Sequence, residues 1–236
     1  MSTLVLVRHG QASLFADDYD SLSPVGETQA RRLGDYWVRL GFTFDAVFAG
    51  PRRRHLRTAN LVGEFYAASG LPWPKAVALP ELDEHEAVNL LAGVRRGLFH
   101  DYPHVRQLAE AYRLAEDPEE KFRRFQKLFE AVIMLWSEGG GTDVEPWPAF
   151  RERVRAGVRR MTEGTRGRRV AVFTSAGPIA VALQMALACP DRTALDLGWR
   201  VRNCSLNEFL FTDGRFSLAG YNALPHLDDA ALWTHL

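Results

Sequence analysis

The first part of the chain alternates between short apolar runs and amphipathic stretches. Leu4–Val7 is a continuous β-prone run followed by Arg8-His9-Gly10, which predicts a strand buried on both faces with polar residues at its carboxyl end. Ser23 and Pro24 are typical of a helix start, as N-cap and first helical residue. We expect this helix to end at Gly41.

The same order of elements then repeats. Asp45–Ala49 predicts a strand, Pro51–Arg57 a basic turn, and the residues from Thr58 to Ala68 a helix. Strands that alternate with helices predict an α/β fold, here a three-layer α/β/α sandwich around a mostly parallel mixed sheet. In such sheets ligands bind at the carboxyl ends of the strands, so Arg8-His9-Gly10 lies where a site is expected.

The middle of the chain shows no strand pattern between Ala87 and Arg160. Asp117 begins a segment that resembles a capping box, and Gly139-Gly140-Gly141 is expected to end it. One face of this predicted helix is apolar: Phe122, Phe125, Phe129, Val132 and Trp136. Phe150–Met161 predicts a second helix, whose arginines form a solvated face.

Strand patterns return near the carboxyl terminus, at Val170–Phe173, Ser205–Phe211 and Phe216–Tyr221. Asp213-Gly214 between the last two is typical of a hairpin turn. The sheet is therefore expected to resume after the helical middle. We predict a single domain over residues 1–236 with a helical insertion, or cap, at residues 87–150.

One uncharged run, Val170–Pro190, reaches the length of a membrane span. Gly177-Pro178 divides it into a short apolar piece and a longer Ala/Leu-rich piece, which predicts a buried strand, turn and helix instead. At the amino terminus, Leu4–Val7 is too short for the apolar core of a signal peptide. We expect no membrane association and a cytoplasmic protein.

Composition narrows the classes of partner. The chain has 236 residues, and its 29 Lys and Arg balance 29 Asp and Glu, so no overall charge attracts it to nucleic acid. Cys189 and Cys204 are too few for a disulfide framework and lack metal-ligand spacing. His100 and His104 lie four residues apart without an accompanying carboxylate ligand, so we predict no metal. No Walker A or GxGxxG motif is present, and no cofactor is implied.

The tripeptide Arg8-His9-Gly10 could perform phosphoryl chemistry. A neutral imidazole supplies a nucleophilic nitrogen, a guanidinium holds two phosphoryl oxygens, and a glycine lets backbone N–H groups come close. Three residues alone also fit an ordinary surface histidine beside an arginine. The tripeptide by itself leaves both interpretations open.

Further motifs in a fixed order make the chain resemble the histidine phosphatase superfamily, also called phosphoglycerate mutase-like. They are Leu22-Ser23-Pro24-Val25-Gly26 with Gln29-Ala30, Arg54 four residues before Thr58-Ala59, Leu82-Asp83-Glu84, Asn203-Cys204-Ser205, and Tyr221-Asn222-Ala223-Leu224-Pro225-His226-Leu227. The resemblance covers the start and the end of the chain. The helical middle corresponds to the variable insertion of that family.

The resemblance implies a metal-independent phosphohydrolase that forms a phosphohistidine. His9 would be the phosphorylated nucleophile, and Arg8 and Arg54 would hold the phosphate. Glu84 would donate a proton to the leaving alkoxide and later take one from water. These roles agree with the chemistry of a phosphomonoester, which needs positioned positive charge and a proton donor for a poor leaving group.

Other acidic residues compete with Glu84 for the proton-donor role. From the residues alone, Asp83 and Glu86 are rivals, and Glu84 itself reads as a surface carboxylate in the acidic stretch Glu81–Glu86. Only the match to the family's Leu-x-Glu pattern selects Glu84.

One departure from the family pattern bears on turnover. Ser175 occupies the position at which the family carries its second histidine, just after the strand Val170–Phe173. Its hydroxyl, and backbone N–H groups from Ala176 onward, can bind phosphoryl oxygens but supply no full positive charge. We expect slow turnover unless His55 or His85 compensates. For each of these two histidines, a polar surface role is an equal alternative.

A second departure bears on substrate. The sequence Gln11-Ala12-Ser13-Leu14-Phe15 replaces the segment in which family mutases commonly carry a Trp-Asn pair that helps to hold phosphoglycerate. We therefore favour hydrolysis over phosphoglycerate mutase activity. The expected substrate-binding residues are Arg8, Arg54, Ser175, Ala176 and Gln11.

A serine hydrolase is a less favoured alternative. Ser175, Asp213 and His226 follow the chain order of an α/β-hydrolase triad. Phe173, two positions before the serine, is too large for the tight turn that such a nucleophile needs. This alternative also leaves Arg8 and His9 without a role.

The stronger alternative is a non-catalytic phosphoryl-binding or scaffolding module that keeps the fold and the arginines. His9 and Glu84 favour the enzyme, because a binding site needs neither a nucleophile nor a proton donor, whereas Ser175 favours the binder. The expected partner is a phosphorylated small molecule or a phosphoprotein, and the sequence does not choose between them. A homodimer is also left open.

Overall fold

A mixed sheet of six strands organises the part of the chain that the computed structural model describes, residues 1–12, 20–140, 143–164 and 166–235. The strands are β1 (Ser2–Arg8), β2 (Ala46–Ala49), β3 (Val77–Ala78), β4 (Arg169–Thr174), β5 (Leu206–Thr212) and β6 (Arg215–Ala223). They lie in the order β3-β2-β4-β1-β5-β6. The first four are parallel to one another, while β5 is antiparallel to β1 and to β6. The predicted mostly parallel mixed sheet is confirmed.

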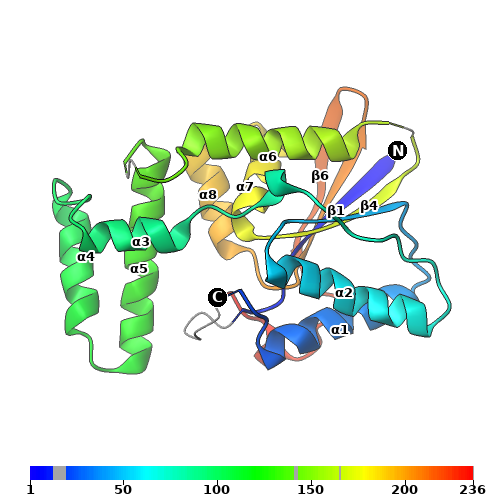
Figure 1. The fold of residues 1–236 in the computed structure, drawn as a ribbon, viewed down its shortest axis with the longest axis horizontal. Coiled ribbons are helices and arrows are strands. Elements are labelled where there is room, and N and C mark those ends of the chain that lie inside the picture. The colour runs from blue at the N-terminus through cyan, green and yellow to red at the C-terminus, as the bar shows by residue number, and fades with distance from the viewer. Residues whose placement is uncertain (13–19, 141–142, 165, 236) are drawn as a thin grey trace. The chain divides into compact units, whose positions relative to one another are not determined.

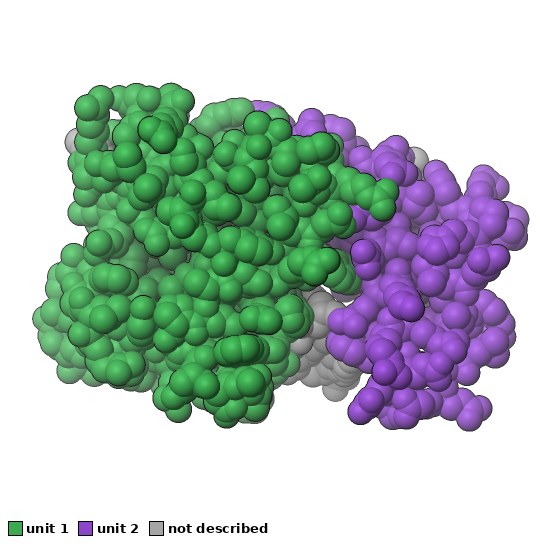
Figure 2. All heavy atoms as spheres, turned by 180° about the vertical axis from the view of Figure 1, so that it is seen from behind, with its two compact units in different colours: residues 1–84, 153–236 green, residues 85–152 purple. Residues whose placement is uncertain are grey.

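The described residues form two compact units, which Figure 2 shows in different colours. Residues 1–84 and 153–236 form the sheet unit, and residues 85–152 form the helical unit. The α-helices are α1 (Pro24–Arg39), α2 (Arg53–Ala68), α3 (Ala87–Arg95), α4 (Pro103–Leu114), α5 (Pro118–Ser137), α6 (Trp147–Thr162), α7 (Ala176–Leu187) and α8 (Asp191–Arg200). Two short 3₁₀ turns are η1 (Pro80–Leu82) and η2 (Ala230–Leu232).

Helices cover both faces of the sheet (Figure 1). Because side chains alternate across a strand, every second residue of β1 faces the same layer. Val5 and Val7 pack with Leu33 and Trp37 of α1 and with Val62 of α2 in one buried cluster. On the other face, α7 contacts β1 and β6, and α8 packs on α7. The three-layer arrangement agrees with the prediction.

The starts of the first two helices show what local sequence can and cannot predict. Ser23 caps α1 as predicted, since its hydroxyl accepts a hydrogen bond from the Gly26 N–H at 3.1 Å. The predicted basic turn at Pro51–Arg57 is wrong, because α2 already begins at Arg53. The Arg53 N–H donates to the Asp20 carboxylate at 2.8 Å. A cap supplied by a distant segment leaves no local signal in the sequence.

The helices of the middle segment were predicted only in part. α5 begins after Asp117, whose carboxylate accepts from the Glu120 N–H at 2.8 Å, as predicted. Gly139 follows α5 with a φ of +97°, while Gly141 of the predicted stop lies outside the described residues. The predicted helix at Phe150–Met161 is confirmed as part of α6, which buries one apolar face, Phe150, Val154, Val158 and Met161. The unpredicted helices α3, α4 and α8 have no side-chain hydrogen bond at their N-caps.

The uncharged run Val170–Pro190 contains most of β4 and all of α7, so the predicted strand and helix are confirmed. The predicted division at Gly177-Pro178 is wrong, because both residues lie in the first turn of α7 and only Ser175 separates the two elements. The lack of charge in this run is explained by burial, because the residues from Gly177 to Gln184 in α7 are all buried. In the described ranges, no helix is long and apolar enough to cross a membrane.

His226 is expected to make the protein sensitive to acid. It is buried in the loop after β6, and neither of its ring nitrogens has a hydrogen-bond partner among the described residues. Burial lowers its pKa from 6.5 to about 4. Unfolding exposes the ring, so below pH 6.5 the unfolded chain binds a proton that the folded protein takes up only near pH 4. Stability is therefore lost as the pH falls through this range.

Replacing this side chain by an aromatic ring that cannot be protonated isolates the effect. Between pH 7 and pH 4, we expect wild type to lose ~3 kcal/mol more unfolding free energy than His226→Phe. Urea unfolding at the two pH values measures the difference. The same pH dependence in both proteins would show that His226 is protonated equally in the folded and unfolded states.

Candidate active site

Neighbouring parallel strands end together and bring distant residues to one edge of the sheet. Arg8 of β1 pairs with Thr174 of β4, so His9 and Ser175 follow side by side from adjacent strands. The His9 N–H donates to the Thr174 carbonyl at 2.8 Å. β2 lies on the other side of β4 and leads into α2, whose first turn carries Arg54. This carboxyl edge is where open α/β sheets bind ligands.

His9 presents an unprotonated ring nitrogen to Arg54. Its Nδ1 lies 2.7 Å from the Gly10 carbonyl oxygen. Because a carbonyl only accepts, Nδ1 carries the ring proton. Nε2 therefore has a lone pair, and it accepts a hydrogen bond from Arg54 Nε at 3.2 Å. In this tautomer Nε2 is available for attack on phosphorus.

The surroundings hold the His9 ring in its neutral form. Burial lowers its pKa well below 6.5, and the charges of Arg54 and Arg8 and the nearby His55 lower the pKa further. The hydrogen bond to the Gly10 carbonyl acts in the opposite direction. A neutral imidazole is the nucleophilic form, so this pKa shift favours the form of His9 that an attack on phosphorus would require.

Two buried arginines flank this ring. Arg54 is 1% exposed, and its Nη1 forms an ion pair with the Asp20 carboxylate at 2.9 Å. Arg8 is 8% exposed and donates from Nη1 to the carbonyl of Val201. Both guanidiniums are thus fixed by other parts of the protein, as preorganised stabilisation of a phosphoryl group requires.

The loop after η1 carries Glu84, whose carboxylate reaches the N-terminus of α7. Its Oε2 accepts from the Gly177 N–H at 3.2 Å. Arg52 holds the same loop, with Nε at 2.6 Å from Asp83 Oδ1 and Nη2 donating to the Glu84 carbonyl at 3.1 Å. Asp83 Oδ1 also accepts from the Glu84 N–H at 2.8 Å. Asp83 therefore fixes the loop, and Glu84 carries its carboxylate to the end of β4.

Ser175 and His55 form a buried pair beside His9. Ser175 Oγ lies 2.6 Å from His55 Nε2. The centroid of the His55 ring is 5.5 Å from that of His9. Burial and the charge of Arg54 lower the pKa of His55 well below 6.5, and Glu84 acts in the opposite direction. We call the cluster of Arg8, His9, Arg54, His55, Glu84 and Ser175 the His9 site.

Close packing fixes the loop after β1. The Gly10 N–H donates to Thr58 Oγ1 at 3.1 Å, and the Thr58 hydroxyl donates to the Arg54 carbonyl at 2.7 Å. A Cβ on Gly10 would lie 2.4 Å from the carbonyl oxygen of Gly26 in α1. The sequence suggested that Gly10 gives a phosphate access to backbone N–H groups. In the structure, the small size of Gly10 allows α1 to pack closely against this loop, and the Gly10 N–H already donates to Thr58 Oγ1.

The carboxyl-terminal tail is tied to the same loop. Asn203 Nδ2 donates to the His9 carbonyl at 3.1 Å, and its Oδ1 accepts from the Thr234 hydroxyl at 2.9 Å. Gln29 Nε2 donates to Thr234 Oγ1 at 2.9 Å, and its Oε1 accepts from the Gln11 N–H at 2.8 Å. The family-like residues at the two ends of the sequence thus form one network.

The predicted site residues differ in how the structure places them. Arg8, His9, Arg54, Glu84 and Ser175 come together in the His9 site, and their roles stay predictions. Ala176 is the first residue of α7. Gln11 Oε1 accepts from the Ser23 hydroxyl at 2.8 Å. Ser13-Leu14-Phe15, which bear on mutase activity, lie outside the described residues.

The sequence left Asp83 and Glu86 as alternatives to Glu84, and His85 as a histidine that could compensate for Ser175. In the structure these three side chains have other partners. Asp83 pairs with Arg52, as described above. Glu86 belongs to the helical unit, where it is exposed and accepts a hydrogen bond from Asn89. His85 also belongs to the helical unit, and its ring stacks on Trp136 with centroids 5.2 Å apart.

The alternative serine hydrolase triad is not assembled. The histidine bonded to Ser175 is His55, and the ring nitrogens of His226 have no partner in the described part of the chain. Asp213 has an 83% exposed side chain in the turn between β5 and β6. These contacts contradict the triad.

Sequence reasoning missed Asp20. Its two carboxylate oxygens bond the Arg54 guanidinium and the N-terminus of α2. Three aspartates, Asp17, Asp18 and Asp20, occur together in the sequence. Spacing alone could not choose among them, because the contact depends on how the chain returns to α2.

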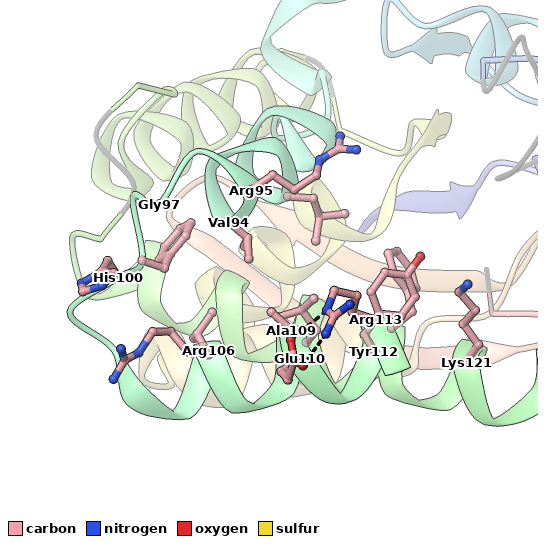
Figure 3. Close-up of a pocket in the computed structure, with 15 residues that line it drawn as sticks. Val94, Arg95, Gly97, His100, Arg106, Ala109, Glu110, Tyr112, Arg113 and Lys121 are labelled. Atoms are coloured by element: carbon pink, nitrogen blue, oxygen red, sulfur yellow. Dashed lines mark hydrogen bonds and ion pairs between the residues drawn. The ribbon is translucent and has the colours of Figure 1, made fainter. Parts of the chain in front are cut away.

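The helical unit has a separate cavity of about 710 Å³ between α3, α4 and α5. Figure 3 shows its mainly apolar lining with Arg95, Arg106 and Lys121 around it. The Glu110 carboxylate in this lining is paired with Arg113 at 2.6 Å. The lining contains no residue of the His9 site.

A family model described as the histidine phosphatase superfamily (branch 1) matches residues 4–139 and 115–224. The chain belongs to this superfamily. Members of this superfamily include phosphatases and mutases. This membership supports the prediction that the protein is an enzyme.

Two curated relatives of this chain are 2,3-bisphosphoglycerate-dependent phosphoglycerate mutases. The protein from Thermobifida fusca (strain YX) is 42% identical over 79 residues, which are 31% of this chain and 31% of that protein. The protein from Nitrobacter hamburgensis is 37% identical over 93 residues, 37% of this chain and 45% of that protein. The match thus spans less than half of either relative.

Solved structures share the fold over nearly the whole chain. The α-ribazole phosphatase of Shigella flexneri has a TM-score of 0.63 at 20% identity, covering 94% of this chain and 96% of that one. A mycobacterial glucosyl-3-phosphoglycerate phosphatase in complex with inorganic phosphate has a TM-score of 0.64 at 21% identity, covering 96% and 99%. Phosphoglycerate mutase from Bacillus anthracis has 0.61 at 20% identity, covering 95% and 94%. Both activities occur on this fold, so the fold does not choose between them.

Proposed function

We propose that this histidine phosphatase hydrolyses phosphomonoesters through a phosphohistidine on His9. The observation that carries the proposal is the buried Nε2 of His9, which is unprotonated and lies 3.2 Å from Arg54 Nε. An anion drawn to the Arg54 guanidinium is brought next to the nucleophilic nitrogen.

In the first step, Nε2 of His9 attacks phosphorus and the bond from phosphorus to the ester oxygen breaks. Glu84 gives its proton to the departing alkoxide. The phosphorylated imidazole is a cation, and the Gly10 carbonyl that accepts from Nδ1 stabilises it. Arg8 and Arg54 balance the charge of the phosphoryl oxygens.

In the second step, the Glu84 carboxylate takes a proton from water as the water oxygen attacks phosphorus. The bond from nitrogen to phosphorus breaks, inorganic phosphate is released, and His9 returns to its neutral form. The reaction needs only these side chains and water.

A second candidate function is phosphoglycerate mutase activity, because the curated relatives named above are mutases. A mutase returns the phosphoryl group to the organic product, whereas a hydrolase transfers it to water. Incubation with 3-phosphoglycerate separates the two functions. We expect release of inorganic phosphate, and isomerisation without phosphate release would favour the mutase.

Trapping the phosphorylated protein tests the proposal. We expect wild type quenched in alkali during turnover of p-nitrophenyl phosphate to carry a phosphoryl group on His9, because an N-linked phosphoryl group survives alkali and is lost in acid. ³¹P NMR of the denatured protein, with and without acid treatment, identifies the linkage. An acid-stable phosphoryl group on Ser175 would contradict the proposal.

A further inference from the structure

His55 is a buried titratable residue that the reaction above leaves unused. It has no exposed surface, and its Nε2 lies 2.6 Å from Ser175 Oγ. Its ring is also close to the nucleophile His9, with 5.5 Å between centroids. A polar surface role, which the sequence left open, is therefore wrong for His55. A buried imidazole beside reacting groups is a candidate for a part in the reaction.

The Ser175 side chain is oriented toward this imidazole and not toward its own helix. Ser175 is the N-cap residue of α7, where a serine ordinarily accepts a hydrogen bond from a helix N–H. Here the side chain makes no such bond, and the Gly177 N–H is bonded by Glu84. The Ser175 hydroxyl at the end of β4 therefore bonds to His55 and not to a backbone N–H of α7.

Gly50 at the end of β2 makes room for the imidazole. A Cβ on Gly50 would lie 2.3 Å from Nδ1 of His55, which is closer than such atoms can approach. Any other residue at this position would displace the ring and separate it from Ser175. The local backbone is therefore suited to holding His55 in this place.

Burial and the charges around His55 together lower its pKa well below 6.5, and burial is the larger cause. Arg54 and Arg52, from the start of α2, disfavour its cationic form, while Glu84 in the loop after η1 favours it. His9, at the end of β1, is the fourth group beside it. A phosphoryl group brings negative charge into this cluster, which favours the cation.

We propose that His55 and Ser175 act as one cationic donor to the phosphoryl group. When the phosphoryl group binds, His55 takes up a proton from solvent and forms a new N–H bond. In this cationic form Nε2–H donates a hydrogen bond to Ser175 Oγ, and the Ser175 hydroxyl donates a hydrogen bond to a phosphoryl oxygen. The extra proton returns to solvent when phosphate leaves, so no bond between heavy atoms forms or breaks. Ser175 touches the phosphoryl group, and His55 is a positioning residue. The inference rests on the proposed function of the His9 site.

A double-mutant cycle tests whether the two residues act as a unit. We expect His55→Gln and Ser175→Ala each to lower kcat/KM for p-nitrophenyl phosphate by roughly 10²-fold. The double variant is expected to lose about as much as either single one, because neither residue works without the other. Losses that multiply to roughly 10⁴-fold would overturn the inference.

Nitrogen NMR of ¹⁵N-histidine-labelled protein provides a readout that a structural role would not move. On addition of inorganic phosphate at pH 7, we expect one imidazole of wild type to become protonated, and none in His55→Gln. His226→Phe serves as the matched control and should keep the change. A His55 ring that stays neutral in phosphate-bound wild type overturns the inference, even where the variants fold poorly.

The two proposals fail in different ways. Absence of a phosphoryl group on His9 during turnover would refute the proposed function. An active wild type that forms the phosphohistidine while His55 remains neutral would refute only the role of the pair.

Discussion

His9→Ala is expected to lower kcat for p-nitrophenyl phosphate by roughly 10⁴-fold or more, since removal of a covalent nucleophile leaves only binding and electrostatic stabilisation. The reason lies in the geometry of Nε2, which is unprotonated and faces Arg54 at 3.2 Å. Release of p-nitrophenolate under saturating substrate measures the loss. The same variant should yield no alkali-stable phosphoprotein.

The matched control for this variant is His104→Ala, which removes an exposed histidine of α4 and should leave kcat unchanged. Circular dichroism of both variants checks that the fold is kept. If His9→Ala retained more than a tenth of wild-type turnover, another residue would be the nucleophile. If wild type bound phosphate but released no p-nitrophenolate, the non-catalytic module would be the better description.

Glu84→Gln is expected to have the second-largest effect, and its size should depend on the leaving group. A general acid contributes typically ~10²–10⁴-fold when the departing oxygen needs a proton. With glycerol phosphate, whose alkoxide is a poor leaving group, we therefore expect a loss in that range. With p-nitrophenyl phosphate, whose phenolate leaves without a proton, the loss in the first step should be much smaller. Initial rates of phosphorylation on the two substrates measure the difference.

Glu86→Gln is the matched control, because Glu86 is an exposed acid two positions along the chain with a hydrogen bond to Asn89. We expect it to behave like wild type on both substrates. Equal losses for Glu84→Gln on both substrates would mean that Glu84 does not protonate the leaving group. In that case its bond to the Gly177 N–H would be its main contribution.

Local signals in the sequence were enough to predict the central part of the fold. The apolar run Leu4–Val7 lies in β1, and Ser23 and Pro24 begin α1, as the sequence predicts. Both elements are predictable because a buried strand and a capped helix are indicated by residues that are adjacent in sequence. The start of α2 was mispredicted because the carboxylate at its N-terminus belongs to Asp20. Contacts between segments that are distant in sequence cannot be predicted from the pattern of neighbouring residues.

The candidate site could be predicted as a set of residues but not as a set of contacts. The family-like motifs selected His9, Arg54 and Glu84, which the structure gathers at one edge of the sheet. The bond between His55 and Ser175 joins positions 120 residues apart. It depends on the parallel pairing of β2 with β4, which places the ends of the two strands side by side. A sequence pattern contains neither the register nor the space that Gly50 leaves.

The network through Asn203 and Gln29 makes Thr234 a support for the loop that carries His9. Thr234 bonds to both side chains, and through Asn203 it is two hydrogen bonds from the His9 carbonyl. A substitution of Thr234 by alanine would therefore loosen the backbone of His9, although the two residues are far apart in sequence. The position of a ring at the carboxyl edge of the sheet thus depends on a hydroxyl in a segment that follows the last strand.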